Sequence, residues 1–240
     1  MKPYYDRDGI TVYHARWEDV LAAGLIPVRE VALVHADPPY GTRQKFNRGG
    51  AVGVGRKMAK IGGGKVREFA PVTGDDKPFD PAPLLALGLP LVTWGANHYT
   101  SRLPDSPAAF FWDKRDDALA PPDDGSDGEY AWTNIGASIR TFRHYWRGAI
   151  RKTEKADVHL HATQKPIALC SWVYARAKLK RGDLVLVPYM GSGPDLAACV
   201  AMGLRCIACE VEEEYCRVAV GARLHAAVGV ESPGPLFAPR

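Results

Sequence analysis

The sequence contains no run of about eighteen apolar residues, and it does not begin with a basic segment followed by an apolar one. The first absence argues against a membrane-spanning helix, and the second argues against a secretory leader. We therefore expect a soluble, cytoplasmic chain. Its 240 residues, of which 46% are hydrophobic, are enough to bury one good core, so we predict a single domain over residues 1–240.

Cysteine is scarce and odd in number, and its five members lie in apolar or helical surroundings. Cys206 and Cys209 have the spacing of half a zinc site. They lie in a strand-like run, however, where residues three apart face opposite sides. No second pair completes a set of four ligands. We predict buried, reduced thiols and no metal site.

Acidic residues are absent between residues 41 and 67, where eight basic residues are interleaved with glycines. Such a segment cannot build a core, and we predict a mobile basic loop at about residues 41–80. A solvated insertion is one interpretation. We favour a loop whose cations contact nucleic-acid phosphates. The candidate contacts are Arg43, Lys45, Arg48, Arg56, Lys57 and Lys60.

A second basic cluster, between residues 140 and 152, carries aromatic residues among its charges. Basic and aromatic side chains together suit a surface that grips a nucleic-acid strand, unless some of these rings belong to the core. Arg143 and Arg147 are the candidate contacts, and residues 113–160 are a candidate target-recognition subdomain. A net charge of +4 and a pI near 8.8 are compatible with a nucleic-acid partner.

A complete Gly-x-Gly-x-x-Gly motif is missing, which argues against a dinucleotide site. Residues 183–193 nevertheless read as a buried strand running into a glycine-rich turn, with a helix beginning at Pro194. A second strand, at 205–210, ends in an acid. This layout is typical of a nucleotide-cofactor site, in which the acid takes ribose hydroxyls. The candidate ligands are Tyr189, Gly191, Ser192, Gly193 and Glu210.

An acid, two prolines and an aromatic residue follow the apolar run at 31–34, as Asp37, Pro38, Pro39 and Tyr40. The prolines fix their backbone and remove two amide donors, which leaves carbonyl acceptors facing a ligand. Asp37 adds another acceptor, and Tyr40 offers a flat face for stacking. This combination predicts a pocket for a heteroaromatic ring that bears an exocyclic amino group.

The string His-Ala-Thr-Gln-Lys-Pro at 161–166 precedes apolar residues at helical spacing. Thr163 is a candidate cap for this helix, with Pro166 in its first turn. On its own, the string indicates no more than a capped amphipathic helix.

Taken in order, these strings resemble the signatures of the beta class of DNA amino-methyltransferases, and in particular its short prophage-type members. The Asp-Pro-Pro-Tyr string resembles the catalytic motif of that family, and residues 161–166 resemble its His-Pro-Thr-Gln-Lys-Pro signature. The resemblance spans residues 10–225. It implies S-adenosylmethionine as the cofactor, with Thr163, Gln164 and Lys165 helping to hold its methionine end. It also implies double-stranded DNA as the substrate.

Strands and helices are expected to alternate along the chain. This indicates an α/β, Rossmann-like fold with a mostly parallel sheet and helices on both faces. The resemblance implies the S-adenosylmethionine-dependent methyltransferase version of this fold, with seven strands of which one is antiparallel. We expect strands at 10–14, 30–36, 90–94, 108–112, 184–187 and 205–209, and helices at 17–23, 82–88, 165–179, 194–202 and 213–226.

The resemblance further implies methyl transfer to N6 of a flipped-out adenine, with Asp37, Pro38, Pro39 and Tyr40 as the catalytic residues. Asp37 and the Pro38 carbonyl would accept hydrogen bonds from the amino group and localise its lone pair, while Tyr40 holds the base out of the duplex. An aspartate rather than a serine before Pro-Pro-Tyr favours adenine, and methylation of cytosine N4 is the alternative. RNA methyltransferases usually place the glycine turn before the Asp-Pro-Pro motif.

Two positions depart from the family. Val187 stands where relatives usually carry an acid, and Ala15-Arg16 where they often carry Gly-Asp. One lost charge-assisted hydrogen bond to the cofactor's ammonium corresponds to about ten- to over a hundredfold in affinity. A catalytically weak or silent DNA-binding relative is therefore an alternative. A second copy of the chain and a cognate restriction nuclease are further candidate partners, and on DNA the protein would associate with the nucleoid.

Overall fold

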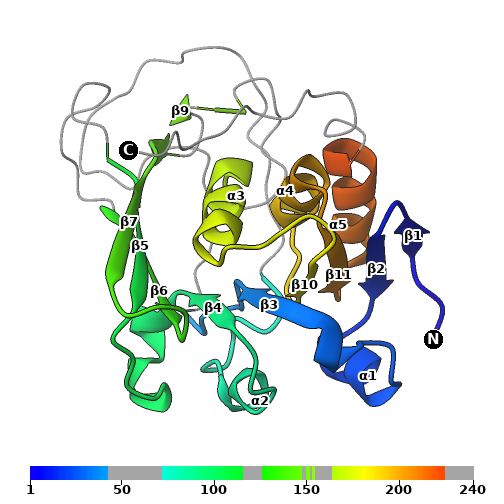
Figure 1. Cartoon of the computed structure of the whole chain (residues 1–240), viewed down its shortest axis with the longest axis horizontal. Helices are drawn as coiled ribbons and strands as arrows, with labels where there is room; N and C mark the ends of the chain where they lie inside the picture. Colours follow the sequence, from blue (N-terminus) through cyan, green and yellow to red (C-terminus); the bar gives the residue numbers. More distant parts are fainter. Residues whose placement is uncertain (43–71, 116–125, 148–149, 152, 155–163, 225–240) are drawn as a thin grey trace.

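The computed structural model describes residues 1–42, 72–115, 126–147, 150–151, 153–154 and 164–224. Its centre is a nine-stranded sheet with the order β1-β2-β11-β10-β3-β4-β6-β5-β7, beside a two-stranded sheet, β8-β9 (Figure 1). The strands are β1 (Tyr5–Arg7), β2 (Ile10–His14), β3 (Val31–Ala36), β4 (Leu91–Trp94), β5 (Ala109–Asp113), β6 (Gly128–Thr133), β7 (Ile139–Arg143), β8 (Trp146–Arg147), β9 (Ile150–Arg151), β10 (Leu184–Val187) and β11 (Arg205–Glu210).

Helices cover both faces of the large sheet. Figure 1 shows α3, α4 and α5 on one side and α1 and α2 on the other. The helices are α1 (Trp17–Ala22), α2 (Ala82–Leu85), α3 (Ile167–Arg176), α4 (Pro194–Met202) and α5 (Glu213–Val218), with short turns η1 (Val28–Glu30), η2 (Ala96–His98), η3 (Thr100–Arg102) and the π-helical η4 (Ala219–Leu224). None of the helices in the described ranges combines the length and apolar character that crossing a bilayer requires.

Two hydrophobic cores lie on the two faces of the sheet, and alternation along the strands fills both of them. On β3, Leu33 packs with α3 and α4, whereas Val34 packs with α1 and α2. The central strands are buried on both faces, which is why they read as continuous apolar runs. Cys206 and Cys209 belong to opposite cores, and all five cysteines are free and buried, as expected from the sequence.

The centre of the sheet contains a change of direction. β3 and β10 are parallel neighbours; the chain continues from β3 to β4 on one side and from β10 to β11 on the other. Helices diverge at such a point and leave a crevice at the carboxyl ends of the two strands, where ligands bind in open α/β sheets. The fold therefore places the two strongest sequence motifs beside each other, because one follows β3 and the other follows β10.

Most expected elements are present, but the sheet is larger than the resemblance implied. It has nine strands rather than seven, and antiparallel pairs join β1 to β2, β4 to β6 and β6 to β5. The final helix, expected at 213–226, is regular only to Val218 and continues as η4. Within the range considered for a recognition subdomain, β6 and β7 are strands of the main sheet.

The start of α3 also corrects an expectation. The helix begins at Ile167 with Pro166 at its N-cap position, so Thr163, which lies outside the described residues, does not occupy the cap. The backbone amide of Ile167 instead donates to the Glu154 carboxylate at 2.7 Å. An acid from a distant part of the chain thus satisfies one free amide of the first turn.

Candidate active site at the ends of strands β3 and β10

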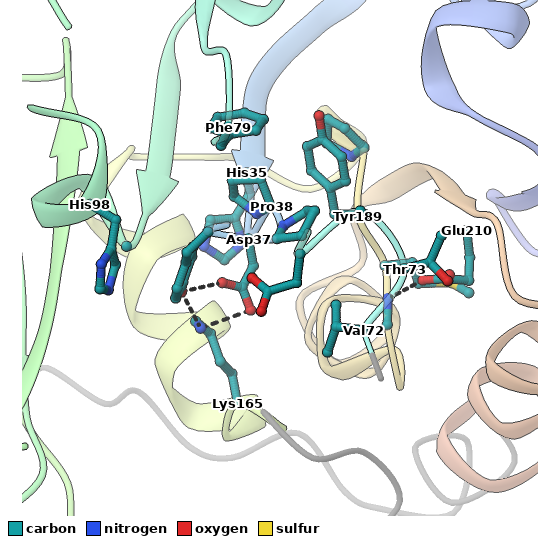
Figure 2. A pocket seen from close by; sticks show the side chains of 18 of the residues that line it. His35, Asp37, Pro38, Val72, Thr73, Phe79, His98, Lys165, Tyr189 and Glu210 are labelled. Carbon is teal, nitrogen blue, oxygen red and sulfur yellow. Dashed lines mark hydrogen bonds and ion pairs between the residues drawn. The ribbon is translucent and has the colours of Figure 1, made fainter. Parts of the chain in front are cut away.

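A cavity of about 910 Å³ opens at the carboxyl ends of β3 and β10. Asp37 and Lys165 face each other on one side of the cavity, and Glu210 lies on the other side (Figure 2). The four residues predicted to be catalytic all line it, and so do six of those predicted to bind the cofactor. These are Asp37, Pro38, Pro39 and Tyr40, with Gln164, Lys165, Tyr189, Gly191, Ser192 and Glu210.

Asp37 is held from two sides. The Tyr40 hydroxyl donates to its Oδ1 at 2.6 Å, and the Lys165 ammonium lies 2.7 Å from its Oδ2. Lys165 is only 5% exposed, so this ion pair is shielded from water. Because a carboxylate oxygen can accept two hydrogen bonds, Asp37 is oriented by these partners and can still accept one from the amino group of a ligand.

Glu129, on β6, reaches the same site, although it was not among the site residues predicted from the sequence. Its Oε2 lies 2.9 Å from the Lys165 ammonium, and Lys114 pairs with its other oxygen. Burial alone would raise the pKa of Glu129, but the two ammonium groups bring it down to about 2. Burial would likewise lower the pKa of Lys165, and Asp37 and Glu129 raise it above its usual value instead. Lys165 therefore stays charged between two carboxylates.

This arrangement predicts an acid-sensitive contribution to stability. The pKa of Glu129 is lower in the folded chain than in the unfolded one, so its contribution is complete above the ordinary carboxyl value and declines as the pH falls towards 2. Glu129→Gln should be less stable than the wild type at about pH 6, and this difference should narrow by about pH 3. Urea unfolding of both proteins measures it. A constant difference over this range would contradict the prediction.

Tyr40 is already stacked. Its ring and that of His98 lie 5.2 Å apart between centroids, at an interplanar angle of 17°. The ring also packs against Gly95, where a Cβ atom would lie 2.1 Å from Cε1, and Gly95 has a φ of 69°, so only glycine fits there. Burial, followed by the nearby charge of Asp37, raises the pKa of Tyr40 well above its ordinary value, which keeps the hydroxyl protonated as a donor.

The glycine turn after β10 shapes the other end of the cavity. Gly193 has a φ of 77° and packs so tightly that a Cβ atom would lie 2.6 Å from that of Ala219. Gly193 does not line the cavity itself; it lets the chain turn into α4, which begins at Pro194 as expected. The turn thus presents Gly191 and Ser192 to the cavity.

Glu210 follows this turn in space. Its Oε2 accepts the Gly191 amide at 2.8 Å, and its Oε1 accepts the amides of Val211 and Glu212 at 2.8 and 2.9 Å. Burial raises the pKa of Glu210 even though these three amides lower it. The acid is therefore fixed by backbone donors at the cavity wall, a position suited to accepting hydroxyl groups of a ligand.

Aromatic and acidic side chains close the cavity between these two ends, and apart from Tyr189 they were not among the predicted site residues. Tyr189 receives a hydrogen bond from the Trp17 indole at 3.2 Å and meets Phe79 edge to face. Asp75 accepts the amides of Gly41 and Thr42 at 2.8 and 3.1 Å, which ties the start of the basic segment to its end. Local sequence carries no signal for these contacts, because each joins segments far apart in the chain.

Most of the predicted DNA contacts lie outside the described part of the chain. These are Arg43, Lys45, Arg48, Arg56, Lys57, Lys60 and the side chain of Arg147. Thr163, a predicted cofactor ligand, lies outside it as well. The Arg143 side chain is 74% exposed on β7 and lies 3.1 Å from Asp113. Tyr145 and Trp146, two rings of the same basic cluster, are buried, and so they do not form an exposed stacking surface. Trp146 packs in the core and also lines the cavity.

The two positions that depart from the family have different surroundings. Val187 is 1% exposed, packs in the core beneath α3 and α4, and is not part of the cavity lining. Arg16 is exposed, lines the cavity and pairs with Glu18 at 3.2 Å. Within the described residues, neither position supplies an acid to the cavity.

Sequence comparison adds an independent observation. Residues 108–221 match the family model described as "DNA methylase". This segment is therefore similar in sequence to the N6/N4 DNA methylases. It is also 31% identical over 80 residues to the type II methyltransferase M2.DpnII of Streptococcus pneumoniae. That match covers 33% of this chain and spans 30% of the length of M2.DpnII.

Two solved structures share the fold of this chain. The PvuII DNA methyltransferase, described as cytosine-N4-specific, superposes with a TM-score of 0.57 at 12% identity, over 91% of this chain and 88% of the other. The M1.HpyAVI–SAM complex superposes with a TM-score of 0.51 at 19% identity, over 88% of this chain and 98% of the other. The Rossmann-like methyltransferase fold expected from the sequence is therefore confirmed.

Proposed function

We propose that the chain is a DNA methyltransferase that transfers a methyl group from S-adenosylmethionine to N6 of an adenine flipped out of the duplex. One observation carries the proposal. The acceptor-and-stacking motif after β3 and the glycine turn with its acid after β10 open into the same cavity of about 910 Å³. A cofactor at the turn would direct its reactive group towards a base held at Asp37.

The base end has the chemistry that an aromatic amine requires. The N6 lone pair of adenine is delocalised into the ring, so the nitrogen is a weak nucleophile until its protons are held by acceptors. Asp37 and the Pro38 carbonyl supply acceptors, and Tyr40 and Lys165 orient the Asp37 carboxylate. Positioning and electrostatics of this kind are the contributions a protein makes when its cofactor supplies the reactive group.

The cofactor end offers matching contacts. Gln164, Tyr189, Gly191 and Ser192 line the cavity, and Glu210 faces the place where the ribose hydroxyls of a nucleoside would lie. S-adenosylmethionine supplies an electrophilic methyl group on a sulfonium, so the protein has to bind this cofactor and align it with the amino nitrogen. The cavity has room for both partners.

Incubation of the protein with double-stranded DNA and methyl-labelled S-adenosylmethionine tests the proposal. Digestion of the DNA to nucleosides should give labelled N6-methyl-2′-deoxyadenosine. Labelled N4-methyl-2′-deoxycytidine would retain the methyltransferase and correct its target base. Unlabelled DNA beside labelled RNA in a parallel incubation would overturn DNA as the substrate. Calorimetry with S-adenosylhomocysteine separates a silent relative from an active enzyme, because a protein that binds DNA but no cofactor cannot transfer the methyl group.

The acid-free basic segment gives a prediction about DNA affinity. Converting Arg56, Lys57 and Lys60 together to glutamine should weaken binding to every DNA sequence. If all three contact phosphates, the slope of log affinity against log salt should flatten by about three. Fluorescence anisotropy over a salt series measures both effects. An unchanged slope would return the segment to the solvated-insertion interpretation.

A further inference from the structure

A buried hydrogen-bond network lies beneath the cavity and is not explained by base binding. At its centre, the Asp195 carboxylate in the first turn of α4 accepts from His35 Nδ1 at 2.5 Å and from the Tyr174 hydroxyl at 2.5 Å. The thiol of Cys170 donates to the same carboxylate. Trp94 Nε1 donates to the other ring nitrogen of His35 at 2.8 Å.

The tryptophan fixes the tautomer of His35. An indole N–H can only donate, so His35 Nε2 must be unprotonated in order to accept from it. The single proton of a neutral imidazole then lies on Nδ1 and points at Asp195. The ligand atoms of His35, Cys170 and Asp195 lie within 4.8 Å of one another, as in a metal site. The proton on Nδ1 makes this trio a hydrogen-bond network instead.

The consequence is an uncompensated negative charge. Hydrogen bonds from His35 and Tyr174 hold the buried Asp195 carboxylate in place. These two donors and the Cys170 thiol are neutral, and no lysine or arginine among the described residues forms an ion pair with Asp195. A buried carboxylate is normally paired with a cation as well as hydrogen-bonded.

The position of this charge indicates where its cation comes from. Asp195 lines the cavity next to the glycine turn, and its side chain is 10% exposed. Leu33, two residues before His35 on β3, packs in the same core as Val187, so the His35–Asp195 pair lies on the same sheet face as Val187. The network thus provides an anion in the region where Val187 provides none.

We propose that Asp195 binds the ammonium group of the methionine moiety of the cofactor. The inference rests on the proposed function, because it assumes that S-adenosylmethionine occupies this cavity. His35 and Tyr174 are positioning residues that hold the carboxylate, and the ligand supplies the cation. The acid of the cofactor site therefore comes from the helix after the glycine turn and not from the strand before it.

Two ligands separate this role from a structural one. S-adenosylhomocysteine carries the ammonium but no sulfonium, and methylthioadenosine lacks the amino-acid part altogether. By calorimetry, Asp195→Asn should lower the affinity for S-adenosylhomocysteine by about 10- to 100-fold, which corresponds to one charge-assisted hydrogen bond. Its affinity for methylthioadenosine should stay within about twofold of the wild-type value. Asp105→Asn, an exposed aspartate outside the cavity lining, is the matched control and should change neither affinity.

If the affinities for both ligands fell equally, Asp195 would have a purely structural role and the proposal would be overturned. Unchanged affinity for S-adenosylhomocysteine would overturn it too, because Asp195 would then not contact the ammonium. If the wild type binds neither ligand, the proposed function fails together with this inference. If Asp195→Asn does not fold, Tyr174→Phe decides instead, because it removes a neutral donor and keeps the charge. Because Tyr174 positions the carboxylate, this variant should bind S-adenosylhomocysteine more weakly than the wild type and methylthioadenosine within about twofold of it. Equal weakening of both ligands, or unchanged binding of S-adenosylhomocysteine, would overturn the assignment.

Discussion

Replacing Asp37 by asparagine should lower the rate of methyl transfer by about 10²- to 10³-fold, the usual contribution of a group that stabilises charge developing in a transition state. The amide keeps the shape of the side chain but replaces one acceptor oxygen with a donor nitrogen. It also removes the charge opposite Lys165, which retains Glu129 as a partner. Single-turnover transfer of labelled methyl groups to DNA measures the effect.

Cofactor binding serves as the internal check on this result. Asp37→Asn should bind S-adenosylhomocysteine within about threefold of the wild type, because a group that acts in the chemical step need not contribute to ground-state binding. The control Asp105→Asn should match the wild type in both assays. A variant that kept more than about a tenth of the wild-type rate would remove Asp37 from the chemistry.

The second large effect concerns stability. Lys165→Met should lower the free energy of unfolding by about 3–5 kcal/mol, because it removes the buried cation that Asp37 and Glu129 share. Two carboxylates, those of Asp37 and Glu129, would then face each other without a cation between them. Urea unfolding followed by circular dichroism measures the change. Lys180→Met, at an exposed lysine, should stay within about 0.5 kcal/mol of the wild type.

A double variant distinguishes repulsion from lost packing. If the destabilisation arises from repulsion between the Asp37 and Glu129 carboxylates, then adding Glu129→Gln to Lys165→Met should recover part of the lost stability. The two changes would be strongly non-additive, as expected for residues in one network. If the double variant were less stable than Lys165→Met by the full effect of Glu129→Gln alone, the charges would not be coupled in the way the structure indicates.

The sequence predicts the central part of the fold well because local signals are strong there. β10 is a continuous apolar run, and Pro194 after a glycine turn defines the start of α4. β7 was missed because it is an edge strand with mostly exposed residues and no apolar alternation. β6 begins with glycine and glutamate, and its place between β4 and β5 depends on pairing with distant segments.

The same limit applies to the candidate site. Asp37, Tyr40 and Glu210 could be selected because each follows an apolar strand in a recognisable string. Glu129 and Asp195 could not be given roles, since their importance depends on the partners they meet across the sheet. An acid inside an aromatic or apolar string is the signal that could have identified both. Such a string does not predict which cation or hydrogen-bond donor pairs with the acid.

The stack between Tyr40 and His98 has a consequence for how this protein could discriminate between bases. A base that takes the face of Tyr40 now covered by His98 does not gain a new stack; it exchanges one ring for another. Aromatic contacts of this kind differ from one another by less than their own value of about 0.5–1.5 kcal/mol, so the exchange is close to neutral. Residence of the base then depends on what the histidine cannot provide, namely an exocyclic amine directed at Asp37. Thymine has no such amine, so it would not displace His98 from Tyr40 and would stay in the duplex.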